Sequence, residues 1–156
     1  YSDFVKMRAP QDSLKPGPIV DKKALVLGHH TGIHQFTIGQ RKGIGVFQKT
    51  PLYVLALQAE TNTVVVGPEN DLFRKKAVIS GVHWINTVSP AKPGRFTAKI
   101  RYRSQESPVE VHALSSSQAE VVFTLPQRAI TPGQAIVFYD GTRVAGGGWI
   151  EELPVQ

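Results

Sequence analysis

Short apolar runs that alternate with polar residues, each closed by glycine or proline, limit what this chain can fold into. Glycine and proline together make up 25 of its 156 residues (14 and 11), and no segment has a convincing helical period. Strands separated by turns at intervals of about eight to twelve residues predict a small barrel or sandwich. Such runs in the second half of the chain cover residues 95–103, 108–114, 119–125, 135–139 and 143–152.

Two predicted hairpins carry the same signal in the first half. One covers residues 18–29, with its turn at residues 21–23. The other covers residues 51–66, and its turn includes Asn62, a residue type that tolerates the left-handed conformation. We therefore predict an all-β (mainly β) chain with two domains. Residues 1–80 should form a small β roll around the second hairpin, and residues 81–156 a closed or nearly closed antiparallel β-barrel.

Other segments have a weaker pattern. Residues 1–17 show no clean period and are predicted to be a lead-in to the first strand. Residues 71–76 are predicted to be a basic connection to a strand over residues 77–85, in which Gly81 indicates a bulge or bend. Residues 115–120 are the one place where a short helical turn is expected.

Residues 95–103, RFTAKIRYR, alternate most clearly. On a strand, one face would hold Phe96, Ala98, Ile100 and Tyr102, and the other Arg95, Thr97, Lys99, Arg101 and Arg103. Arginine makes paired hydrogen bonds to phosphate and tyrosine offers a stacking surface, so Arg101 and Tyr102 are candidate RNA contacts. The alternatives are a solvated face for the arginines and a core position for Tyr102. Gln134 follows Thr-Pro-Gly, and we expect its side chain at a loop edge rather than buried.

The stretch over residues 28–46, GHHTGIHQFTIGQRKGIGV, holds five of the 14 glycines. Arg41 and Lys42 lie there between two glycines, and cationic side chains on tight backbone suit a nucleic-acid phosphate backbone. A purely structural glycine turn is an equal alternative. The stretch lacks the Gly-Lys-Ser/Thr ending of a phosphate-binding loop, which argues against a nucleotide-hydrolysing site.

Three of the five histidines, His29, His30 and His34, also lie in this stretch. The chain has no cysteine, and no aspartate or glutamate close to them completes a metal shell. His29 and His30 would also point to opposite faces of a strand. We therefore expect no metal site, and polar turn or RNA-contacting histidines instead. Nor is any serine, cysteine or acid–base pair arranged for catalysis, so no catalytic residue is predicted.

The formal charge is +6, which favours an anionic partner. Residues 1–80 carry 11 basic and 6 acidic residues, and residues 81–156 carry 7 and 6, so the first half holds +5 of the +6. No apolar run approaches membrane-spanning length and no signal-peptide pattern is present, so we expect no membrane partner and a cytoplasmic location. The chain begins at Tyr1 without Met, and we expect it to be a trimmed piece.

The string TIGQRKG at residues 37–43 resembles, without a gap, part of the signature GxHxGxxxYTIGQRKGLG of the tRNA-specific 2-thiouridylases. This family is also known as the tRNA (5-methylaminomethyl-2-thiouridylate) methyltransferases. Phe36 stands in place of its usual Tyr, and Ile44 in place of its usual Leu. Four further blocks are similar to the family in the same order: KPGPIVD, PLYVLALQAETNTVVVG, KIRYR and PQRAITPGQAIVFYDGTRVAGGGWI.

The resemblance covers residues 15–150 and implies the central and C-terminal portions of a three-part enzyme. The missing part would be an ATP-pyrophosphatase domain with an SGGxDS loop, and the last part a translation-factor-like β-barrel. The intact enzyme is expected to use ATP and a persulfide sulfur donor, with a sulfur-carrier protein as partner, to make 2-thiouridine at the wobble position of tRNA. This chain has neither SGGxDS nor the two catalytic cysteines. We therefore expect no cofactor in it and no activity from it alone.

What remains would position the tRNA. By the resemblance, Arg101 and Tyr102 match the family's Arg-Tyr tRNA contact, and Gln134 matches its Gln contact in the PGQ motif. Arg41 and Lys42 lie in a family motif, but their RNA role is inferred from their chemistry alone. The competing interpretation is a non-catalytic β module for protein or ribosome interaction.

Overall fold

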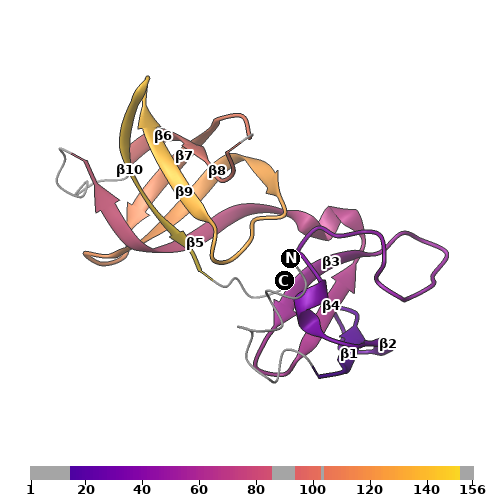
Figure 1. Cartoon of the computed structure of the whole chain (residues 1–156). Helices are drawn as coiled ribbons and strands as arrows, with labels where there is room; N and C mark the ends of the chain where they lie inside the picture. The colour runs from indigo at the N-terminus through magenta and orange to yellow at the C-terminus, as the bar shows by residue number, and fades with distance from the viewer. Residues whose placement is uncertain (1–14, 86–93, 103, 152–156) are drawn as a thin grey trace. The chain divides into compact units, whose positions relative to one another are not determined.

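Two separate β-sheets make up the described part of the chain (Figure 1). The structure is a computed structural model, and it describes residues 15–85, 94–102 and 104–151. The predicted all-β fold is confirmed. The chain divides into two units between Leu72 and Phe73, whereas the boundary predicted from the sequence lies between residues 80 and 81. The difference arises because one long strand, β5 (Phe73–Trp84), belongs to the second unit from its first residue.

The first unit is a four-stranded sheet in the order β2-β1-β4-β3. Both predicted hairpins are present: β1 (Gly17–Val20) pairs with β2 (Val26–His30), and β3 (Tyr53–Gln58) pairs with β4 (Thr63–Gly67), each antiparallel. The two hairpins join through β1 and β4, which are parallel. Asn62 has a φ of 50°, as predicted for its turn.

The long segment between β2 and β3 helps to form the core of this unit. It begins with a 3-10 helix, η2 (Ile33–Gln35), and supplies three buried apolar side chains, Ile33, Phe36 and Ile44. They pack with strand residues that are fully buried, Ile19, Val54, Val64 and Val66. The segment is therefore packed onto the sheet through these three side chains.

The second unit is a closed barrel in the order β10-β5-β8-β7-β6-β9, with every neighbouring pair antiparallel. Its core holds Phe123 and Phe138, and the Trp84 ring stacks on Phe138 at a centroid distance of 5.6 Å. The closed antiparallel barrel predicted from the alternation is confirmed. Its other strands are β6 (Gly94–Lys99), β7 (Ser107–Ala113), β8 (Gln118–Arg128), β9 (Ala135–Asp140) and β10 (Arg143–Ile150).

Close approach between strands explains the run of three glycines in β10. A Cβ on Gly146 would lie 2.5 Å from the carbonyl oxygen of His83, and one on Gly147 would lie 2.5 Å from that of Ile136. Both distances are too short for any side chain. Gly81 has a φ of 57°, which fits the bend predicted for this position in β5.

Three local predictions are wrong. The predicted connection over residues 71–76 contains the end of a 3-10 helix, η3 (Glu69–Leu72), and then the start of β5. Residues 118–120 are strand rather than helical turn, because the backbone N–H groups of Leu114 and Ser115 both donate to the Gln118 carbonyl and close a hairpin. The predicted strand over residues 95–103 ends at Lys99.

Ser104 ends that strand. Its hydroxyl accepts from the Arg101 N–H at 3.2 Å and donates to the Arg101 carbonyl at 2.8 Å, so it gives Arg101 the partners that a strand ladder would otherwise supply. Residues 1–14 of the predicted lead-in, and Arg103, lie outside the described residues. Among the residues that the structure does describe, no helix is long and apolar enough to cross a membrane.

Candidate RNA-contacting surfaces

Tyr102 projects from the turn that follows β6. Ala98 and Ile100 are buried as the alternation predicted, but Tyr102 is 98% exposed. The core position considered for Tyr102 is therefore wrong. The strand ends before this residue, so its side chain no longer follows the alternation. A fully exposed tyrosine on a fixed turn is free to stack on a base.

The Arg101 side chain ties this turn to the loop after β8. Its Nη2 donates to the carbonyl oxygen of Ala129 and, at 3.4 Å, to that of Arg128. Ala129 is buried and has a φ of 53°, an uncommon conformation for a residue with a Cβ. Bonds to described residues use only one of the guanidinium nitrogens, and the group has five N–H donors in all. Arg101 can therefore hold the loop and contact phosphate together.

Gln134 belongs to the same loop. Thr131 donates its hydroxyl to the Ala129 carbonyl at 3.0 Å, and the Gln134 N–H donates to the Thr131 carbonyl at 3.3 Å. The Gln134 side chain is not displayed as predicted, because its Oε1 is buried and has no hydrogen-bond partner. The N–H of Ile150 bonds the Gln134 carbonyl at 2.8 Å and so draws this residue toward β10. Arg101, Tyr102 and Gln134 thus share one hydrogen-bonded set of loops.

Glu106 reduces the positive charge beside this surface. Its carboxylate accepts from the Thr97 hydroxyl at 2.7 Å and lies 3.3 Å from the Lys99 ammonium. The Thr97 hydrogen bond, with a smaller contribution from Lys99, holds the pKa of Glu106 below its ordinary value. The cationic face predicted for residues 95–103 is therefore partly neutralised at Lys99.

Arg41 and Lys42 lie in the first unit, on a turn held by Gln40. The Gln40 side chain accepts from the Thr37 N–H at 3.0 Å and donates to the Lys42 carbonyl at 2.9 Å. The backbone of Gln40 pairs with Val54 of β3 at 2.9 Å. Arg41 and Lys42 are both exposed. The fixed turn thus presents two cations, and it belongs to a different unit from Arg101.

The histidines of this stretch do not converge. His29 is exposed and His30 is buried, as predicted for neighbours on a strand. The His30 Nε2 lies 3.0 Å from the Asn62 carbonyl oxygen, which ties β2 to the turn of the second hairpin. Within the described ranges, no group of three or more histidine, aspartate or glutamate side chains is placed to hold a metal.

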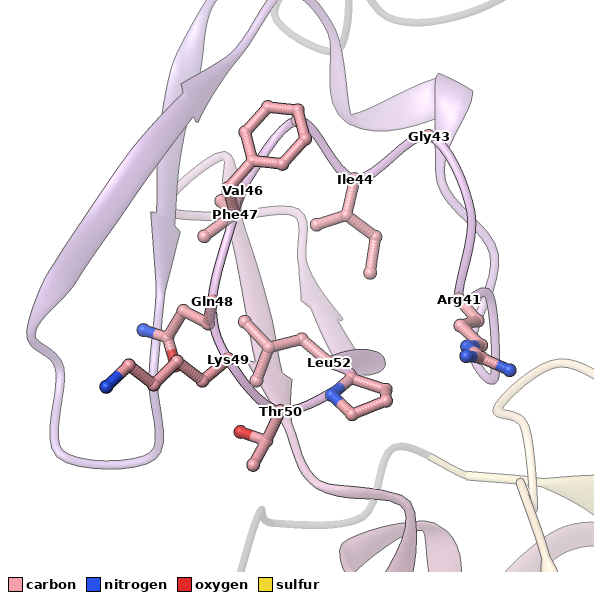
Figure 2. Close-up of a pocket in the computed structure, with 11 residues that line it drawn as sticks. Arg41, Gly43, Ile44, Val46, Phe47, Gln48, Lys49, Thr50 and Leu52 are labelled. Carbon is pink, nitrogen blue, oxygen red and sulfur yellow. The ribbon is translucent and has the colours of Figure 1, made fainter.

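One further surface was not predicted from the sequence. Residues 41 and 43–52 line a pocket of about 530 Å³, and Phe47 on its rim is 99% exposed (Figure 2). The available signal was the alternation in GIGVFQK: Ile44 and Val46 pack against the core, so Phe47 must face outward. A phenylalanine among other apolar residues is usually assigned to the core, so the sequence does not predict that this ring is exposed.

Each unit matches a family model. Residues 2–68 match the tRNA methyl transferase PRC-barrel domain, and residues 74–150 match the Aminomethyltransferase beta-barrel domain. The chain is therefore of the class that pairs these two β domains. It resembles the tRNA-specific 2-thiouridylases MnmA of Magnetococcus marinus (48% identity over 96% of this chain), Nostoc punctiforme (46% over 89%) and Halothermothrix orenii (44% over 88%).

The chain belongs to the tRNA-specific 2-thiouridylase family. It spans 42%, 40% and 38% of the lengths of those three relatives, respectively. The family resemblance seen in the motifs is thus confirmed, and it covers the central and C-terminal portion.

Proposed function

We propose that this chain binds and positions tRNA for a tRNA-specific 2-thiouridylase. One observation carries the proposal: Tyr102 is 98% exposed on a turn whose backbone is fixed by Ser104 and by the Arg101 guanidinium. An aromatic ring and a guanidinium on adjacent residues offer base stacking and phosphate contact together. The net charge of +6 favours the same partner.

Arg101, Tyr102 and Gln134 form the first surface of this proposal, and Arg41 and Lys42 the second. The intact protein would adenylate the 2-oxygen of the wobble uridine with ATP and replace it with persulfide sulfur. This chain holds no cysteine to carry that sulfur. Its part is therefore to bind and orient the RNA, and positioning of this kind contributes to the rate because the entropy of bringing the reactants together is lost on binding rather than in the reaction step. A sulfur-carrier protein as partner and a cytoplasmic location complete the proposal.

A titration of labelled, unmodified tRNA transcript tests this. Because Tyr102 is exposed, Tyr102→Ala should leave thermal unfolding unchanged and weaken binding by roughly 1–3 kcal/mol. Arg101→Ala should reduce the salt dependence by about one phosphate contact, whereas Gln134→Ala should leave that slope nearly unchanged. Arg143→Ala, an exposed arginine on β10, is the matched control. Three variants that all bind like the parent would refute the proposal.

A second candidate, protein contact, is favoured by one feature of the barrel. A shallow groove of about 300 Å³ runs along β5, β9 and β10, and its lining includes Ile85, Val144 and Trp149, which are 45%, 45% and 57% exposed. Exposed apolar grooves of this kind often mark protein interfaces. If protein contact were the role of this chain, substitutions at Trp149 would abolish binding of the protein partner. The chain would then show no tRNA binding, and so no dependence of tRNA binding on Tyr102.

A further inference from the structure

The pocket lined by residues 41 and 43–52 has an apolar floor and a cationic rim. Ile44, 5% exposed, and the partly buried Val46 and Leu52 form the floor, and all three pack against the core of the first unit. Figure 2 shows the side chains of Ile44 and Leu52 directed into the hollow, with Arg41 on one side and Lys49 on the other. None of the 11 lining residues is acidic.

Phe47 gives this pocket an aromatic edge. Its ring is 99% exposed, so it contributes nothing measurable to folding, and a ring in full contact with water gains free energy when a partner covers it. Gly45, with a φ of 80°, lets the chain turn between the inward-facing Ile44 and Val46. The loop therefore holds the ring outward by its construction.

The charge around the pocket selects the kind of partner. From residue 22 to residue 59 the chain has no acidic residue and five basic ones: Lys22, Lys23, Arg41, Lys42 and Lys49. Among described residues, Lys22 is paired with Asp71 at 3.4 Å, while no salt bridge involves Arg41, Lys42 or Lys49. Lysine is depleted in the cores of protein interfaces, whereas unpaired cations around an aromatic ring are typical of single-stranded nucleic-acid sites.

The geometry points to a single-nucleotide subsite for RNA in this pocket. A base would stack on Phe47 and cover the apolar floor, while Arg41 and Lys49 would contact the flanking phosphates. The volume of about 530 Å³ accommodates one nucleotide. The inference deepens the proposed function, on which it rests, because it assigns the first unit its own contact with unpaired RNA. A protein domain covering the same ring is the alternative outcome of the test.

The test uses two probes, the unmodified tRNA transcript and a short oligouridylate of about ten nucleotides. Phe47→Ala should weaken binding of both by about 5- to 150-fold, with unchanged thermal unfolding and an unchanged salt slope. Phe47→Leu should weaken binding of both probes by a similar factor, because leucine keeps an apolar side chain but has no aromatic face on which a base can stack. Phe47→Trp should bind like the parent, and its fluorescence should be quenched by the oligouridylate beyond the change seen for Trp84 and Trp149 in the parent.

The rim cations have their own readout. Lys49→Ala should lower the salt dependence by about one phosphate contact, whereas Lys75→Ala, an exposed lysine on β5 outside the pocket, should not. A parent chain that binds neither probe, or a Phe47→Ala variant that binds both like the parent, would overturn the inference. A Phe47→Leu variant with full affinity would also overturn it, since a protein partner or simple apolar burial needs no aromatic ring.

The two proposals fail separately. If Phe47→Ala weakens oligouridylate binding while Tyr102→Ala, Arg101→Ala and Gln134→Ala leave the tRNA titration unchanged, the subsite stands and the barrel role is wrong. If the barrel variants lose tRNA affinity and Phe47→Ala does not, the subsite is wrong and tRNA positioning stands.

Discussion

Replacing Arg101 should weaken the barrel itself as well as RNA binding. The guanidinium joins the turn after β6 to the carbonyls of Arg128 and Ala129, at the start of the loop that leads to Gln134. A hydrogen bond from a charged donor contributes about 1.5–3 kcal/mol when it is protected from water. Arg101 is exposed, and the Ala129 carbonyl keeps the Thr131 hydroxyl as a donor, so we expect about 1 kcal/mol for Arg101→Ala after allowance for solvent.

Thermal unfolding measures this loss. For a unit of this size, about 1 kcal/mol corresponds to a fall in Tm of roughly 4–8 °C. Hydrogen exchange shows where the stability is lost. In Arg101→Ala, the amides of Gln134 and Ile150, which form hydrogen bonds in these loops, should exchange faster than in the parent. Arg143→Ala should change neither measurement, because no hydrogen bond or salt bridge between described residues joins the Arg143 side chain to these loops.

Arg101→Lys separates the two roles. Lysine keeps the positive charge, but its Nζ ends one bond short of the Nη2 atom that reaches both carbonyls, so it should restore the salt slope of tRNA binding without restoring the Tm. An Arg101→Ala variant with parental Tm and parental exchange at Gln134 would refute the reasoning. The guanidinium contact would then contribute nothing to the fold, and Arg101 would act on RNA alone.

Two further predictions concern stability. Glu106→Gln should be less stable than the parent near pH 7, because the carboxylate pairs with Lys99 and accepts the Thr97 hydrogen bond more strongly than a neutral group does. The difference should vanish as the pH falls through the lowered Glu106 pKa. Urea unfolding at several pH values measures it, and a difference that persists in acid would contradict it. Gly17→Ala should lower the free energy of unfolding of the first unit by about 1–3 kcal/mol or more, because its Cβ would collide with the Asn62 carbonyl. At Gly45 an added Cβ meets open space, so Gly45→Ala should cost only about 1 kcal/mol, from backbone strain at its positive φ. Urea unfolding of the two variants compares these costs, and equal losses would contradict the collision.

The sequence predicted elements whose signals are local. The alternation over residues 51–66 predicted a hairpin, and Asn62 predicted its turn, because strand period and turn chemistry both lie within a few residues. The barrel was predicted in the same way, from alternating strands separated by turn residues along the second half of the chain. The boundary near Leu72 did not, since Phe73–Lys76 lack alternation and become strand only by pairing with β8.

The candidate sites were less predictable, because single side chains decide them. In the sequence, the alternation of residues 95–103 continues past Lys99. In the structure, the Ser104 hydroxyl hydrogen-bonds both the N–H and the carbonyl of Arg101, and the chain turns there. Tyr102 consequently faces water rather than the core. The pattern of apolar and polar residues does not predict these hydrogen bonds between Ser104 and the Arg101 backbone. Gln134 shows the reverse effect, with an oxygen buried in a loop that composition predicts to be open.

Both candidate surfaces share a way of being built. In the first unit, the Gln40 side chain bonds Thr37 and Lys42 and fixes the turn that carries Arg41. In the second, Ser104 fixes the turn that carries Tyr102. Each turn is thus held by a short polar side chain within three residues of the groups it binds, without help from RNA. Ordering a loop on binding costs affinity, so a turn already fixed in the free protein retains more of its stacking and phosphate-contact energy. Substitutions at Gln40 and Ser104 should therefore weaken RNA binding, although the proposal gives neither side chain an RNA contact, which is the expected mark of a positioning residue.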